Sequence, residues 1–77
     1  MTRRKAQTFK AWRKGRHSGA IDGSNLQPVF GVVRRLAVPY QRDPTGTAIL
    51  VPHHRFDDVL AALELDGHHV SYQDALW

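Results

Sequence analysis

Two histidine pairs are the residues of this sequence whose type and spacing first suggest chemistry. His53-His54 and His68-His69 stand at the two ends of the segment RFDDVLAALELDG. Imidazole side chains are common metal ligands and acid–base groups. The segment between the pairs has helical periodicity, and a helix of about thirteen residues is roughly 20 Å long. A zinc ion with bonds of about 2 Å cannot take ligands from both ends, so we predict no metal site.

The other reactive side chains match no catalytic or cofactor-binding pattern. The chain has no cysteine, which excludes disulfides, thiolate metal sites and cysteine nucleophiles. The serines lie outside any nucleophile elbow, and the P-loop and dinucleotide-binding fingerprints do not occur. Asp57 and Asp58 are adjacent on the predicted helix, so their carboxylates diverge by about 100°. We therefore expect a protein that is not an enzyme and that binds no cofactor.

Basic residues gather near the N-terminus. Residues 1–21 carry a charge of +7 without one acidic residue, and residues 22–77 carry −3, which gives the total of +4. Aromatic side chains lie among these cations, a combination that suits phosphate neutralisation and stacking on bases. This pattern predicts contact with nucleic acid or a ribonucleoprotein, and the alternatives are a solvated tail or a tail that binds an acidic protein. The residues expected to contact nucleic acid are Arg3, Arg4, Lys5, Lys10, Trp12, Arg13, Lys14 and Arg16, with Arg34, Arg35 and Arg42 extending the surface.

Acidic residues between and after the histidine pairs favour a second hypothesis. Their carboxylates repel phosphate, but they suit a basic protein surface. In this hypothesis the chain is a small inhibitor or adaptor, encoded by a phage or mobile element. It binds a host protein or nucleoprotein complex through the acidic helix or an open sheet face, unless the acids are only a solvated helix face. The residues assigned to protein interaction are Asp57, Asp58, Glu64, Asp66 and Trp77.

The elements expected to position these residues begin with an extension. Residues 1–17 are predicted to form a basic arm, flexible or short-helical, because Ala6, Phe9 and Trp12 recur every three residues. Residues 18–27 are rich in glycine, serine and asparagine, so they are predicted to form a linker.

Residues 28–77 are predicted to form a compact α+β domain of two layers, with the order ββαβ. Residues 29–40 are β-branched and aromatic, which predicts a long strand. A turn at residues 43–46, of the form Asp-Pro-Thr-Gly, then reverses the chain into a strand over 47–52. The helix over 54–66 ends at Gly67, and a strand over 68–73 follows.

The expected sheet has three strands with the helix packed on one face as a crossover, so the strands over 47–52 and 68–73 are expected to be parallel. The other sheet face is left uncovered. A core this small favours a homo-oligomer or a permanent protein partner. The absence of cysteine fits a cytoplasmic location, and no apolar run approaches the roughly 18 residues that a membrane helix needs.

Overall fold

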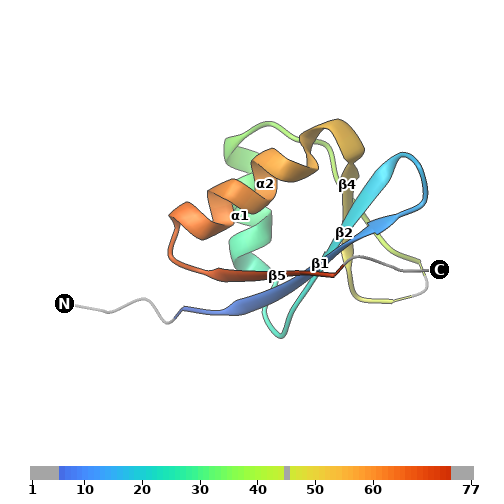
Figure 1. Ribbon diagram of the computed structural model, residues 1–77. Coiled ribbons are helices and arrows are strands. Elements are labelled where there is room, and N and C mark those ends of the chain that lie inside the picture. Colours follow the sequence, from blue (N-terminus) through green and yellow to red (C-terminus); the bar gives the residue numbers. More distant parts are fainter. Residues whose placement is uncertain (1–5, 45, 74–77) are drawn as a thin grey trace.

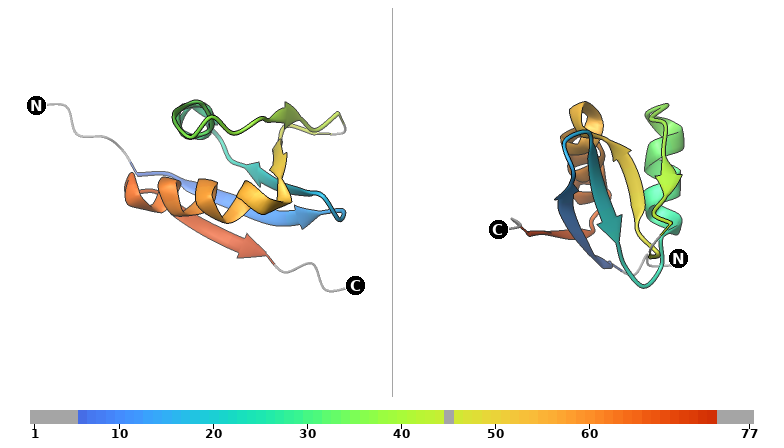
Figure 2. Two further views of the ribbon diagram at one scale, coloured as in Figure 1. Left: turned by 90° about the horizontal axis from the view of Figure 1, so that it is seen from above. Right: turned by 90° about the vertical axis from the view of Figure 1, so that its right-hand side faces the viewer.

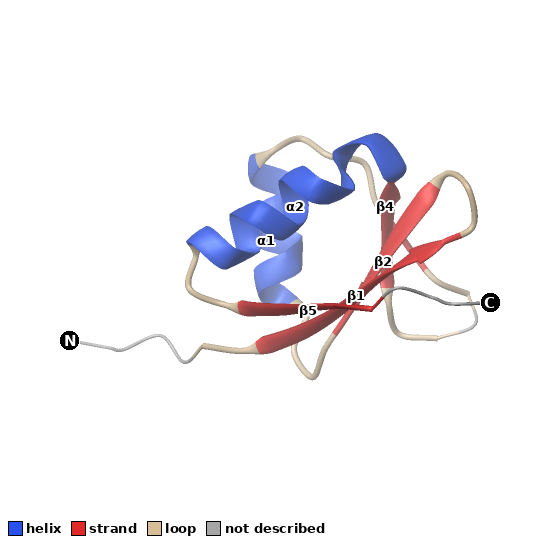
Figure 3. Cartoon of the chain, viewed as in Figure 1, coloured by secondary structure: helices blue, strands red, loops and turns tan. Residues whose placement is uncertain are grey.

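Five strands and two helices make up the part of the chain that the computed structural model describes, residues 6–44 and 46–73. Figure 1 shows them as a sheet with both helices on one of its faces. Figure 3 separates helices from strands by colour in the same view. The elements are β1 (Thr8–Lys14), β2 (Ser18–Asp22), α1 (Gln27–Arg35), β3 (Gln41–Arg42), β4 (Ile49–Pro52), α2 (His53–Leu65) and β5 (His69–Gln73).

The sheet is mixed and has the strand order β3-β4-β2-β1-β5. Neighbouring strands are antiparallel except at one edge, where β5 runs parallel to β1. The connection from β4 through α2 to β5 therefore passes over β2 and β1 (Figure 1). The right-hand view of Figure 2 faces β1, β2 and β4, with α2 behind them. One face of the sheet thus carries the helices, and none of the described elements lies on the opposite face.

The core lies between the helices and the sheet. Alternation along β1 places Phe9 and Ala11 in it, because successive side chains of a strand point to opposite faces. The helices contribute apolar residues at helical spacing. The buried residues of α1 are Val29, Val32 and Val33, and those of α2 are Phe56, Val59, Ala62 and Leu63.

The second half of the sequence folds as its pattern predicts. α2 covers residues 53–65, where a helix was expected over 54–66, and Gly67 has a φ of 94° at its C-terminal end. β4 and β5 lie in the segments expected to be strands. The N–H of Gly46 donates a hydrogen bond of 3.2 Å to the carbonyl of Asp43, as the predicted turn requires.

The first half of the sequence differs from the prediction. Residues 8–14 are not an arm or a short helix but the strand β1, which lies between β2 and β5. The expected linker contains β2, and the expected long strand over 29–40 is largely the helix α1. The valines that we assigned to a strand by their β-branched side chains also recur at i, i+3 and i+4, and burial of that stripe outweighs local propensity.

These differences change the sheet as well. The structure is α+β with two layers, but it has five strands and two helices instead of three strands and one helix. β5 pairs with β1 and runs in the same direction as β4, as expected for strands joined by a crossover helix, but β2 and β1 lie between them. The sequence pattern could not predict that β1 pairs with β5. The two strands are far apart in the chain, so no turn between them indicates the pairing.

Candidate binding surfaces

The uncovered face of the sheet brings together three of the residues predicted to bind nucleic acid. Lys10, Trp12 and Lys14 alternate with the buried side chains of β1, so they lie on the face away from the helices. Trp12 stands opposite Ala20 of β2, which in turn stands opposite Leu50 of β4. This face therefore combines one half-buried aromatic ring and apolar neighbours with two lysines.

Acidic side chains neutralise much of this face. Lys14 forms an ion pair with Asp43, whose side chain is only 6% exposed. Lys10 stands opposite Asp22 in the register of β1 and β2. Because each lysine has a carboxylate beside it, the uncovered face is not the continuous basic surface that the sequence predicted.

The remaining basic residues are spread over the molecule. Arg13 and Arg16 are exposed at and beyond the end of β1, and Arg42 is exposed on the edge strand β3. Arg34 and Arg35 are exposed on α1, where Arg35 pairs with Asp66 at 3.2 Å. The structure does not bring these five arginines together in one patch. Arg3, Arg4 and Lys5 lie outside the described residues, as does Trp77.

The four histidines of the opening pattern have different surroundings. His68 is buried, its Nδ1 accepts a 3.2 Å hydrogen bond from the N–H of Gln7, and its ring packs edge-on against Phe9. His53, His54 and His69 are exposed at the start of α2 and of β5. In the described part of the chain, no group of three histidine, cysteine or acidic side chains could hold a metal ion.

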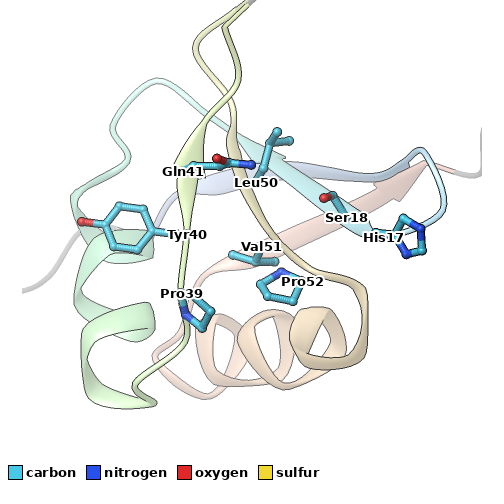
Figure 4. A pocket seen from close by; sticks show the side chains of 8 residues that line it. All are labelled: His17, Ser18, Pro39, Tyr40, Gln41, Leu50, Val51 and Pro52. Carbon is cyan, nitrogen blue, oxygen red and sulfur yellow. The ribbon is translucent and has the colours of Figure 1, made fainter.

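A pocket of about 240 Å³ opens beside the edge formed by β3 and β4 (Figure 4). Figure 4 shows Tyr40 pointing toward α1, whereas Gln41 points toward Leu50. Among the described residues, no carboxylate, lysine or arginine lines this pocket. Its lining residues are His17, Ser18, Pro39, Tyr40, Gln41, Leu50, Val51 and Pro52.

A second hollow, of about 310 Å³, lies between α2 and β5, which run side by side in Figures 1 and 2. We call it the α2–β5 groove. Four of its residues form one stripe of α2 at i, i+3, i+4 and i+7, and two come from β5. The groove has an apolar floor with a carboxylate toward each end. It is lined by Asp57, Leu60, Ala61, Glu64, Val70 and Tyr72.

The carboxylates predicted to bind protein divide into two kinds. Asp58 pairs with Arg55 at 3.1 Å, and Asp66 pairs with Arg35. Asp57 and Glu64 are exposed and have no ion pair with any described residue. The two acids of the groove are thus the ones that remain available to a basic partner.

Sequence reasoning named Asp57 and Glu64 but missed the apolar residues between them. The signal was present, since the spacing of the stripe places both acids and two apolar residues on one side of the helix. Val70 and Tyr72 could not be added from the sequence, because only the fold shows that β5 lies beneath this stripe at a sheet edge.

Comparison with protein-family models, curated proteins and solved structures found no match to this chain. Neither helix of the described part is long and apolar enough to cross a membrane.

Proposed function

We propose that this chain is a non-enzymatic protein-interaction module, an inhibitor or adaptor, whose partner docks on the α2–β5 groove. One observation carries the proposal: Asp57 and Glu64 have no ion pair among the described residues, and they flank apolar residues beside an exposed sheet edge. An apolar floor between charges provides both contact area and selectivity for basic partners.

Charge reversal in the groove tests this function. The chain is immobilised, native partners are captured from a lysate at moderate salt, and each is identified with and without nuclease treatment. We expect a specific protein that binds the wild-type chain regardless of nuclease and is released by the double variant Asp57→Lys, Glu64→Lys. The matched control is Asp58→Asn, because that acid is paired with Arg55 and lies outside the groove. A partner that the double variant retains contradicts the proposal.

Single-stranded nucleic acid is the second candidate partner. It is favoured by the position of Trp12 between Lys10 and Lys14 on the uncovered face, where a base would stack on the indole ring. Trp12→Ala would then weaken binding to an oligonucleotide about fivefold to 150-fold, the equivalent of about 1–3 kcal/mol for one stacked base. Affinity that stays undetectable at low salt excludes this candidate.

A further inference from the structure

The two edges of the sheet differ in how well they are protected. β3 has only two residues and begins two positions after Pro39, which has no N–H, so it presents only a short edge. β5 has five residues, HVSYQ, with no proline, lysine or acid among them. Natural edge strands usually carry such residues, because they discourage pairing with another chain. In the described part of the chain, β5 is therefore the edge that is open to an added strand.

The backbone of β5 shows which groups an added strand would meet. The N–H of His69 donates a hydrogen bond of 2.8 Å to the carbonyl of Gln7, so the backbone N–H and C=O of His69 point toward β1. In a parallel pair such residues alternate with residues whose N–H and C=O point away. Val70 and Tyr72 accordingly point their backbone groups outward, where no described residue accepts or donates to them.

The α2–β5 groove lies above this same edge. Asp57 and Glu64 are seven residues apart on α2, a separation of roughly 10 Å along the helix axis. Residues i and i+4 of an extended segment point to one side about 13 Å apart, with residue i+2 between them. The flexible side chains of lysine or arginine can accommodate the difference between these two separations. Basic residues at i and i+4 of the segment therefore reach both carboxylates, and an apolar residue at i+2 contacts Leu60 and Ala61.

A second copy of this chain fits the edge poorly. If two β5 strands paired antiparallel about a twofold axis normal to the sheet, both α2 helices would lie on the same face of the joined sheet. Asp57 of one copy would then face Glu64 of the other. Like charges at an interface are unfavourable, so the charge of the groove favours a basic partner.

We infer that β5 accepts an extended basic segment of a partner protein as a sixth strand, with its lysine or arginine side chains paired to Asp57 and Glu64. Main-chain hydrogen bonds to Val70 and Tyr72 supply affinity, and the two carboxylates with the apolar floor supply selectivity. The inference rests on the proposed function and adds the chemistry and conformation of the partner.

A synthetic peptide provides the test with the full chain. The probe is a nine-residue peptide centred on Lys-Thr-Val-Thr-Lys, titrated while amide hydrogen exchange is followed by NMR. We expect exchange at Val70 and Tyr72 to slow at least tenfold at saturation. Replacing both groove acids, Asp57→Asn with Glu64→Gln, should weaken the peptide about fivefold to tenfold, the scale of two exposed ion pairs. Asp58→Asn should change its affinity less than twofold.

Matched peptides separate strand addition from charge attraction alone. In an extended peptide the N–H groups of alternate residues point to opposite edges of the strand. N-methylation of every second residue removes the N–H donors of one edge and leaves the charge of the peptide unchanged. One of the two alternate patterns should abolish binding, and the other should leave it within about threefold. Equal binding of both patterns, unchanged exchange at Val70 and Tyr72 on saturation, or equal binding of a glutamate-for-lysine peptide overturns the inference. So does a peptide-free dimer in which Val70 and Tyr72 are already protected, because a second copy then occupies the edge.

The inference and the proposed function fail in different ways. A captured protein that charge reversal releases, but that leaves exchange at Val70 and Tyr72 unchanged, overturns strand addition and retains the docking function. A captured protein that charge reversal does not release overturns the docking function itself.

Discussion

Gly19 determines how closely α2 packs on the sheet. It lies on β2 beneath the helix, and a Cβ atom at this position would overlap the aromatic ring of Phe56. Phe56 is buried, so its ring has little room to move. One missing methyl group thus fixes the contact between the central strands and the helix that carries the groove.

Gly19→Ala is therefore expected to lower the free energy of unfolding by about 1–3 kcal/mol, the usual cost of overpacking a core. The matched control is Gly31→Ala on α1, where a Cβ atom meets nothing within 4 Å. That variant should raise the free energy of unfolding by about 0.5–1 kcal/mol, because alanine favours a helix more than glycine does. Urea denaturation of both variants measures the difference, and equal effects would contradict this packing.

The ion pair between Lys14 and Asp43 is the second feature at the residue scale. Asp43 is buried while the Lys14 side chain is 40% exposed, so removing the lysine leaves a carboxylate with little access to water. Lys14→Met should lower the free energy of unfolding by about 1–2 kcal/mol, less than for a fully buried pair. Lys10→Met, on the same face of β1, should change it by less than about 0.5 kcal/mol. Denaturation at low and high salt checks both values, and a larger effect for Lys10 would contradict them.

Both helices end in the same hydrogen-bonded motif. After α1, the N–H of Ala37 bonds to the carbonyl of Arg34 and the N–H of Val38 bonds to that of Val33. After α2, Gly67 and His68 make the equivalent bonds to Glu64 and Leu63. This is the Schellman motif, which places its C′ residue in the left-handed region. Gly67 adopts that conformation without steric cost because it has no Cβ atom. Ala37 has a Cβ atom and adopts it with a φ of 55°.

The two motifs predict substitutions of opposite sign. Ala37→Gly should stabilise the chain by about 1 kcal/mol and Gly67→Ala should destabilise it by about 1 kcal/mol, because the left-handed conformation costs a residue with a Cβ about 1–2 kcal/mol. Thermal unfolding of the two variants beside the wild type measures both shifts. A destabilising Ala37→Gly would show that this residue does not end α1 as described.

The motif also explains which elements the sequence could predict. α2 was predictable because its apolar stripe, its length and Gly67 all agree. α1 was not, since its valines favour strands and no glycine or asparagine stands at its C′ position. Apolar and polar residues alternate at the start of β1, as in a strand. The apolar Trp12, however, lies on the uncovered face with the lysines, so the alternation is interrupted and the strand was not predicted. The positions of Asp22 and Asp43 beside those lysines depend on contacts between distant parts of the chain, and so does the position of β5 at the groove. No local sequence pattern predicts such contacts.

At the scale of the whole molecule, the N-terminal segment joins β5 to the other strands of the sheet. β1 lies between β2 and β5, and its Phe9 and Ala11 are completely buried. The basic charge of this segment therefore belongs to the fold, and the protein cannot present it as a detached tail from Thr8 onward.

Deletion of residues 1–14 should consequently unfold the chain, because it removes the strand that joins β5 to the sheet. Loss of amide dispersion in a two-dimensional NMR spectrum would report this. Had residues 1–17 been a separate arm, the remaining chain would keep its dispersed spectrum, and that result would contradict the topology. Lys10→Met serves as the control that alters charge in this segment without removing the strand.

The most direct test of protein docking at the α2–β5 groove is amide hydrogen exchange of the full chain, alone and with its captured partner. Docking by strand addition predicts fast exchange at Val70 and Tyr72 in the free chain, slowed at least tenfold in the complex. It also predicts that the Asp57→Lys, Glu64→Lys variant forms no complex and keeps the fast exchange of the free chain. A partner that binds this variant as tightly as it binds the wild-type chain would contradict the account.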